Sequence, residues 1–137
     1  MRSSPNRLVG IVFGVAYVLV GVVGFIVTSD AGVGFFSTEG GLILGIFEVN
    51  VFHNVAHLVV GLALAIASFS GTTAARTINT VIGTTYLLLG IAGLFLVSSA
   101  ANILAINAAD NVLHFASALV LLAVGLGAER RAPASAG

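Results

Sequence analysis

Two short segments place ionisable and amide side chains inside otherwise apolar stretches of the chain. They consist of Asn50, His53, Asn54 and His57 in the first segment and of Asn107, Asp110, Asn111 and His114 in the second. On a helix, the members of each segment share one face within an arc of about 100°. His53 and His57 are four residues apart, a spacing that lets two imidazoles ligate one ion, and Asp110 and His114 repeat that spacing. The two segments therefore predict a buried polar seam, for which a structural role is favoured and metal binding is an alternative.

Three imidazoles and one carboxylate form a candidate set for Zn, Fe, Mn or Cu, with the asparagines orienting the imidazoles. A less favoured alternative is a b-type haem with His57 and His114 as axial ligands, because a short, glycine-packed bundle leaves little volume for it. The chain has no Cys, which excludes thiolate ligands and a cysteine nucleophile. We find no nucleophile motif or phosphate loop, so we predict no catalytic residue and lean away from an enzyme.

The composition indicates that these segments belong to a membrane protein. Hydrophobic residues make up 58% of the 137 residues and charged residues 7%, whereas a soluble domain carries about 25% charged residues. A bilayer core needs about 20 apolar residues of helix. We predict four transmembrane helices at about 8–28, 49–69, 77–98 and 107–128, the first of them an uncleaved helix rather than a signal peptide. A zero net charge without a basic patch argues against nucleic acid as a partner.

The chain repeats itself. Gly14, Tyr17, Gly21 and Gly24 recur as Gly83, Tyr86, Gly90 and Gly93 at an offset of 69, and the two polar segments match at an offset of 57. The second copy therefore has an outer loop 12 residues shorter. The repeats span about 8–69 and 77–128 of a single membrane domain, 1–137. Each copy holds two spans, so both insert alike, and we predict an all-α, up-down-up-down four-helix bundle with a pseudo-two-fold axis along the membrane normal.

Small residues at helical spacing predict the packing faces of the first and third spans. Such residues let helix backbones approach closely, which drives helix association in lipid. The packing glycines are Gly10, Gly14, Gly21, Gly24, Gly83, Gly90 and Gly93. The buried hydroxyls of Tyr17 and Tyr86 need partners, either a local carbonyl or the polar segment of a neighbouring helix.

Asn50 and Asn107 are expected to cap the second and fourth helices. His57 and His114 then lie about 10 Å below the outer surface, at 1.5 Å per residue. At that depth Gly21 and Gly90 are expected to leave room for the imidazoles. Leu42 to Phe47 are expected to form an interfacial segment, with Glu48 near the headgroups.

All five arginines fall on one side of the predicted spans, with Arg76 in the loop between the second and third spans. They are Arg2, Arg7, Arg76, Arg130 and Arg131. By the positive-inside rule both termini are cytoplasmic, including the tail 129–137. We expect the membrane to be the plasma membrane of a bacterium.

Residues 45–58, read as GIFEVNVFHNVAHL, together with the later Asp110-Asn111-Val112-Leu113-His114, resemble the bacterial membrane family of domain of unknown function 4383. The resemblance covers nearly the whole chain, and its most specific element is His-Asn-x-x-His. It implies a four-span protein of high-GC Gram-positive bacteria and implies no mechanism.

Three functions stay open. The first is a structural or accessory protein of a larger membrane complex or homo-oligomer, in which the seam is hydrogen-bonded glue worth about 0.6–2 kcal/mol per pair. The second is the metal or haem site of His53, His57, Asp110 and His114. The third is a proton or small-solute relay, because ionisable residues inside a membrane are functional candidates.

Overall fold

The computed structural model describes residues 4–129 and shows an all-helical bundle with one small sheet. Its elements in chain order are α1 (Pro5–Asp30), β1 (Gly41–Ile43), β2 (Phe47–Val49), α2 (Val51–Ser70), α3 (Thr72–Leu96) and α4 (Ala108–Gly127). All four helices are long and apolar enough to cross a membrane, which confirms the predicted fold class. The predictions for Arg2, Arg130, Arg131 and the tail beyond Glu129 concern residues outside the part of the chain that the structure describes.

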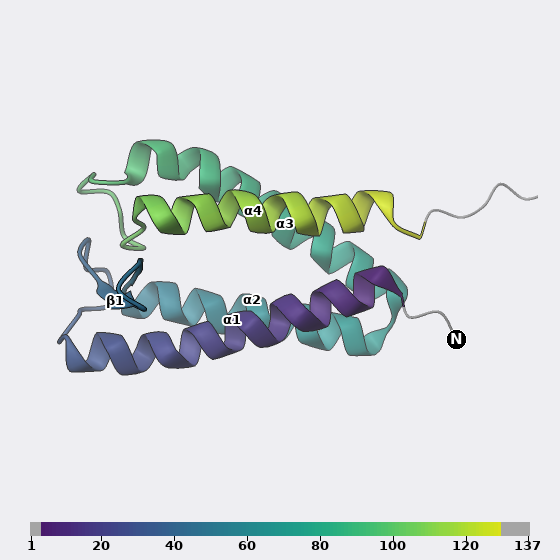
Figure 1. The fold of residues 1–137 in the computed structure, drawn as a ribbon, viewed down its shortest axis with the longest axis horizontal. Coiled ribbons are helices and arrows are strands. Elements are labelled where there is room, and N and C mark those ends of the chain that lie inside the picture. The colour runs from purple at the N-terminus through teal and green to yellow at the C-terminus, as the bar shows by residue number, and fades with distance from the viewer. Residues whose placement is uncertain (1–3, 130–137) are drawn as a thin grey trace, which may run out of the picture.

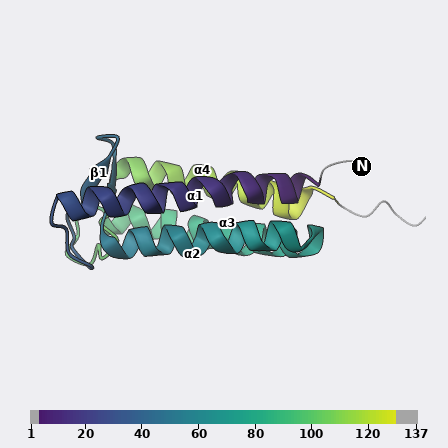
Figure 2. The ribbon, with the colours of Figure 1, turned by 90° about the horizontal axis from the view of Figure 1, so that it is seen from below.

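The helices form two antiparallel pairs that cross each other. α1 packs along α2, and α3 packs along α4 (Figures 1 and 2). The start of α1, the α2–α3 turn and the end of α4 lie together at what we call the arginine end, because Arg7 and Arg76 are there. The loops 31–50 and 97–107 lie at the opposite, hairpin end.

Equivalent bonds in the two copies reproduce the offsets of the repeat. Arg7 Nε donates to the Ser68 carbonyl at 2.8 Å, and Arg76 Nε donates to the Gly125 carbonyl at 2.9 Å. The donors are 69 residues apart and the acceptors 57, as the repeat requires. The same local contact therefore closes the arginine end of both helix pairs.

Helix boundaries follow their caps. Asn50 Oδ1 accepts from the His53 amide at 2.8 Å and Asn107 Oδ1 accepts from the Asp110 amide at 2.9 Å, so both predicted N-caps are confirmed. At the arginine end, Gly71 alone joins α2 to α3 with φ 146°, a conformation that favours glycine. The turn is therefore so tight that Arg76 lies in α3, and its predicted position in a loop is wrong.

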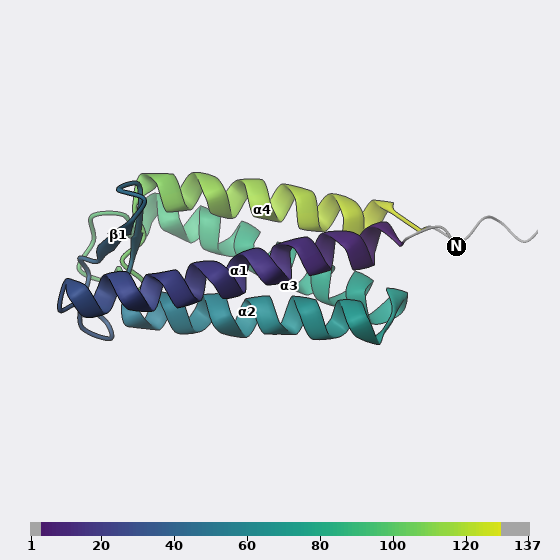
Figure 3. The ribbon, with the colours of Figure 1, turned by 60° about the horizontal axis from the view of Figure 1, so that its bottom comes forward.

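The segment of Leu42 to Phe47, predicted to be interfacial, folds as part of a β-hairpin. β1 and β2 pair antiparallel, with Gly41 opposite Val49, and the turn uses positive φ at Leu44 and Gly45. The Glu48 carboxylate accepts from the Gly40 amide at 2.7 Å. The hairpin lies between α1 and α4, where the two helix pairs diverge (Figure 3).

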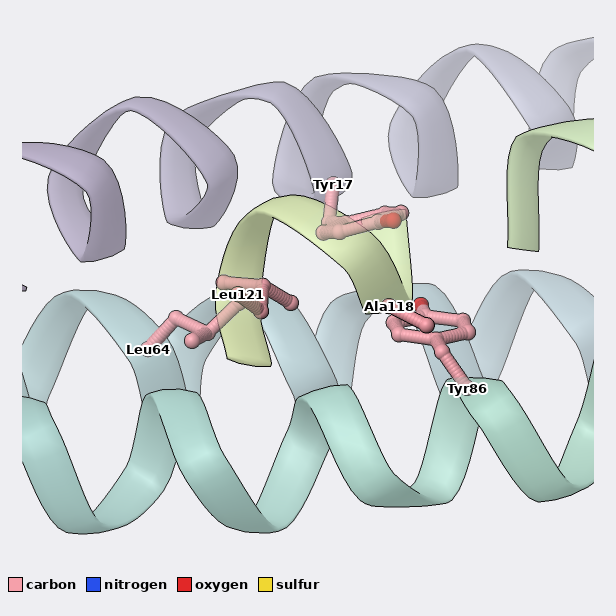
Figure 4. Packing of buried hydrophobic residues seen from close by; sticks show 5 residues of the cluster. All are labelled: Tyr17, Leu64, Tyr86, Ala118 and Leu121. Atoms are coloured by element: carbon pink, nitrogen blue, oxygen red, sulfur yellow. The ribbon is translucent and has the colours of Figure 1, made fainter. Parts of the chain in front are cut away.

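The core between the pairs is small and combines two tyrosines with three aliphatic side chains. Its buried members are Tyr17, Leu64, Tyr86, Ala118 and Leu121 (Figure 4). Leu64 and Leu121 are fully buried and occupy equivalent positions in the two copies. All seven packing glycines are buried, and Gly14 lies so close to α2 that an added Cβ would meet the Ala65 and Gly61 backbones at 2.9 Å.

Candidate functional site

Three histidines from two helices come together near the hairpin end of the bundle. His53 and His57 of α2 have ring centroids 4.4 Å apart, and His53 lies 6.0 Å from His114 of α4. Their exposed fractions are 3%, 7% and 3%. The pseudo-symmetry thus places imidazoles from both copies in one buried cluster.

Tyr17 and Tyr86 join this cluster through their rings. Tyr17 stacks on His57 at 5.5 Å, Tyr86 stacks on His114 at 5.4 Å, and the two tyrosines stack on each other at 5.3 Å. These four rings form an aromatic column that crosses the pseudo-two-fold axis. The Tyr17 hydroxyl donates to Ser117 Oγ at 2.6 Å. Its partner is therefore neither a local carbonyl nor a member of the polar segments.

The asparagines of the seam make structural contacts. Asn54 Nδ2 donates to Thr28 Oγ1 at 3.1 Å, and Asn111 Nδ2 donates to the Gly90 carbonyl at 3.0 Å. The Oδ1 atoms of both asparagines occupy the positions that a Cβ would take on Gly24 and on Gly93. Each Oδ1 therefore faces a glycine Cα–H, a weak hydrogen bond worth about 0.5–1 kcal/mol.

The predicted room for imidazoles beside Gly21 and Gly90 does not exist. A Cβ on Gly21 would meet the Leu58 side chain at 2.9 Å, and one on Gly90 would meet the Phe115 ring at 3.0 Å. The space beside both glycines is filled by apolar side chains. The histidines stack on the tyrosines instead.

Asp110 performs a local task. Its Oδ2 accepts from the Asn107 amide at 2.9 Å, which completes a capping box, and from the Glu48 amide of β2 at 3.1 Å. The carboxylate thus ties the start of α4 to the hairpin. The equivalent residue in the first copy is His53, which has no carboxylate and so cannot make the corresponding contact with the shorter loop of the second copy.

Within residues 4–129, no group of three His, Cys, Asp or Glu side chains is placed to hold one metal ion. Capping engages Oδ2 of Asp110, and stacking on Tyr17 and Tyr86 sets the planes of two imidazoles. The cavity beside the histidines measures about 120 Å³, below the roughly 300–1,000 Å³ of pockets for drug-sized ligands. A porphyrin is too large for it.

That cavity lies beneath the hairpin and has mostly apolar walls. Its lining comes from α1, the hairpin, α2 and α4: Tyr17, Val20, Ile43, Leu44, Phe47, Val49, His57, Asp110, Leu113 and His114. Leu44, at the hairpin tip, is 84% exposed and marks the mouth. An engineered cavity of about 150 Å³ holds benzene. A molecule near that size, or a few waters, therefore fits beside His57 and His114.

The buried polar atoms of the seam that lack a conventional hydrogen-bond partner are of two kinds. The Nδ1 atoms of His53, His57 and His114 are buried and have no hydrogen-bond partner in the described structure. The Oδ1 atoms of Asn54 and Asn111 also lack a conventional partner but face glycine Cα–H groups. A buried polar group without a partner costs about 1–3 kcal/mol. The three histidine Nδ1 atoms are therefore the polar atoms of this region that have no hydrogen-bond partner of any kind among the described residues.

Residues outside the predicted seam complete the polar core. Ser117 lies one turn after His114 on the same face, a spacing that was readable from the sequence. At the arginine end, Asn79 Nδ2 donates to Asn6 Oδ1 at 3.0 Å, and Asn6 Nδ2 donates to Glu129 Oε2 at 3.0 Å. Asn79 lies four residues before Gly83 on the predicted packing face of the third span, but no spacing links it to Asn6 and Glu129, which come from other segments.

Comparison with known proteins agrees with the resemblance of the polar segments. The model of a family described as domain of unknown function (DUF4383) matches residues 7–127. No curated protein and no solved structure matches the chain. The chain belongs to the DUF4383 family.

Proposed function

We propose that this DUF4383 protein is a non-catalytic accessory protein of a bacterial plasma membrane that binds a small, uncharged, hydrogen-bonding molecule beneath its hairpin. The observation that carries the proposal is a set of three buried imidazoles whose Nδ1 atoms lack hydrogen-bond partners in the described structure, two of which line a cavity of about 120 Å³. The expected ligand is about the size of one six-membered ring and bears a hydroxyl, carbonyl or amide group. Apolar walls accept its ring, and His57 or His114 accepts or donates the hydrogen bond.

The charges of the two ends support an outward-facing cavity. Arg7 and Arg76 lie at the end opposite the hairpin, so the positive-inside rule puts that end and both termini in the cytoplasm. The Tyr17–Tyr86 stack and the Leu64–Leu121 layer lie between the histidines and the arginine end. This packed layer favours binding in a closed pocket over transport or proton relay.

A purely structural role is the second candidate, and the asparagines favour it. Asn54 and Asn111 each bridge two helices of one pair, with Nδ2 donating across the pair and Oδ1 facing a glycine Cα–H group. In this case the histidines would also serve only to hold the helices together, in a protein that accompanies a larger membrane complex or a homo-oligomer.

A titration with phenol and toluene separates the two candidates. Phenol matches the cavity in size and offers one hydroxyl, whereas toluene has the same shape without it. In detergent-purified protein with ¹⁵N-labelled histidine, phenol should shift the imidazole nitrogens of His57 and His114 and toluene should not. His57→Gln should abolish the response, and His53→Gln, whose side chain does not line the cavity, should retain it.

Equal effects of phenol and toluene, with no nitrogen shift, would refute ligand recognition by the histidines and leave the structural role. Metal analysis of the same chelator-free sample provides an independent check. A near-stoichiometric metal that disappears in His57→Gln would overturn the neutral-ligand proposal.

A further inference from the structure

A second site lies at the opposite end of the bundle, on the lipid-facing surface between α3 and α4. An open groove of about 570 Å³ begins at the first turns of α3. Arg76 and the exposed threonines Thr72, Thr73 and Thr77 form one wall, and Gly125 lies on the other. The groove therefore combines a cation with hydroxyl groups at the level where α3 begins.

An apolar groove of about 530 Å³ continues from this polar one along the same two helices. The two share Leu126, and the apolar part extends along α4 to Phe115. At 1.5 Å per residue that distance is about 16 Å. One leaflet of a bilayer core is about 15 Å thick. The apolar part therefore has the length of one leaflet.

The orientation of Arg76 suits an anionic group at the head of the groove. Its Nε donates to the Gly125 carbonyl at 2.9 Å, which fixes the guanidinium beside the rim. Among residues 4–129 no hydrogen bond to the terminal amino groups of this exposed side chain is found, and their fork geometry matches a phosphate. Glu129 also lines the rim, and its Oε2 accepts from Asn6.

We infer that this groove binds one anionic phospholipid, with its phosphate at Arg76 and one acyl chain along α4 toward Phe115. The charge of Arg76 selects the headgroup, and the apolar groove holds the chain. This site is independent of the histidine cavity, because the two share no lining residue.

Native mass spectrometry of the full chain in neutral detergent tests this inference with phosphatidylglycerol and phosphatidylcholine of identical acyl chains. The wild type should retain one phosphatidylglycerol in preference to phosphatidylcholine. Arg76→Gln should reduce that preference roughly fivefold, the weight of one basic residue at an anionic surface. Arg7→Gln is the matched control, because Arg7 makes the same bond in the other copy and does not line this groove.

Two further variants separate charge from fold. Arg76→Lys keeps the charge and should retain the preference if Arg76→Gln proves unstable. Ala123→Phe, at an exposed position of the apolar groove, should lower the retention of both lipids. sn-Glycerol 3-phosphate, which has no acyl chain, should not compete. An unchanged preference in Arg76→Gln, an equal loss in Arg7→Gln, or competition by glycerol phosphate would overturn the inference.

Discussion

Gly24→Ala tests how the seam holds α1 against α2. The added methyl group would take the place of Asn54 Oδ1 and push the amide away from α1. The bond from Asn54 Nδ2 to Thr28 Oγ1, 3.1 Å long, would then break at a site where Asn54 is fully buried. An amide left without a partner there costs about 1–3 kcal/mol.

Alanine itself opposes part of that cost. In a helix interior it is favoured over glycine by about 1 kcal/mol. The expected net loss in the free energy of unfolding is therefore about 1–2 kcal/mol. Reversible unfolding of the detergent-solubilised protein, followed by circular dichroism, measures it. Gly127→Ala is the matched control, because a Cβ there meets nothing within 4 Å, and it should be neutral.

A double-mutant cycle sharpens the test. In an Asn54→Ala background the methyl group of Gly24→Ala has nothing to displace, so its cost should vanish or change sign. If Gly24→Ala is as stable as the wild type, or costs the same in both backgrounds, the contact between Asn54 and Gly24 does not hold the helix pair. The equivalent cycle of Gly93 with Asn111 should behave alike, since the two contacts are related by the repeat.

Three further changes probe other parts of the fold. Ser117→Ala should lower the free energy of unfolding by about 1 kcal/mol, because the Tyr17 hydroxyl loses its acceptor; an unchanged melt in the same assay would contradict this role. Gly71→Ala should cost about 1–3 kcal/mol, since φ 146° strains any residue with a Cβ; a stable variant would show that the turn can be remade. Asp110→His makes the two copies alike and should speed proteolysis within the loop 31–50, because the hairpin loses its anchor, whereas Asp110→Asn keeps an acceptor and should not.

Periodicity and capping chemistry made much of the fold predictable. Runs of apolar residues gave the four helices, and Asn50 and Asn107 marked two helix starts because their side chains cap the first turn. The repetition of one two-span hairpin also predicted that the first span pairs with the second and the third with the fourth. These features depend on local sequence and on the requirement that buried polar groups be satisfied.

The hairpin escaped prediction because hydropathy does not report where backbone hydrogen bonds go. Leu42 to Phe47 read as an apolar stretch, while the signal for a turn rested on Gly45 and a left-handed Leu44. The room expected beside Gly21 failed for another reason. The depth estimate took no account of Leu58, which the close contact of α1 and α2 places against that glycine.

Asp110 fits two sequence patterns at once, a metal-ligand spacing and a capping box. Its distance from His114 matches a ligand pair, yet its distance from Asn107 matches a capping box, and the second relation is the one the structure contains. A cap satisfies a backbone amide that would otherwise be orphaned at the helix start. Both of its hydrogen bonds are accepted by Oδ2, one from the amide of Asn107 and one from the amide of Glu48. The capping pattern is therefore the relation that fixes this carboxylate.

The different lengths of the two outer loops explain why only the first copy supplies a hairpin that covers the cavity. The first copy has an outer loop 12 residues longer than the second, and these extra residues accommodate the hairpin. The hairpin crosses to the second copy, where Asp110 Oδ2 accepts from the Glu48 amide. An aspartate at this position is thus matched to the long loop. His53 occupies the equivalent position in the other copy and joins the histidine cluster. The longer loop and the exchange of His53 for Asp110 therefore convert a duplicated seam into a roofed pocket with two imidazoles in its wall and a third packed against them.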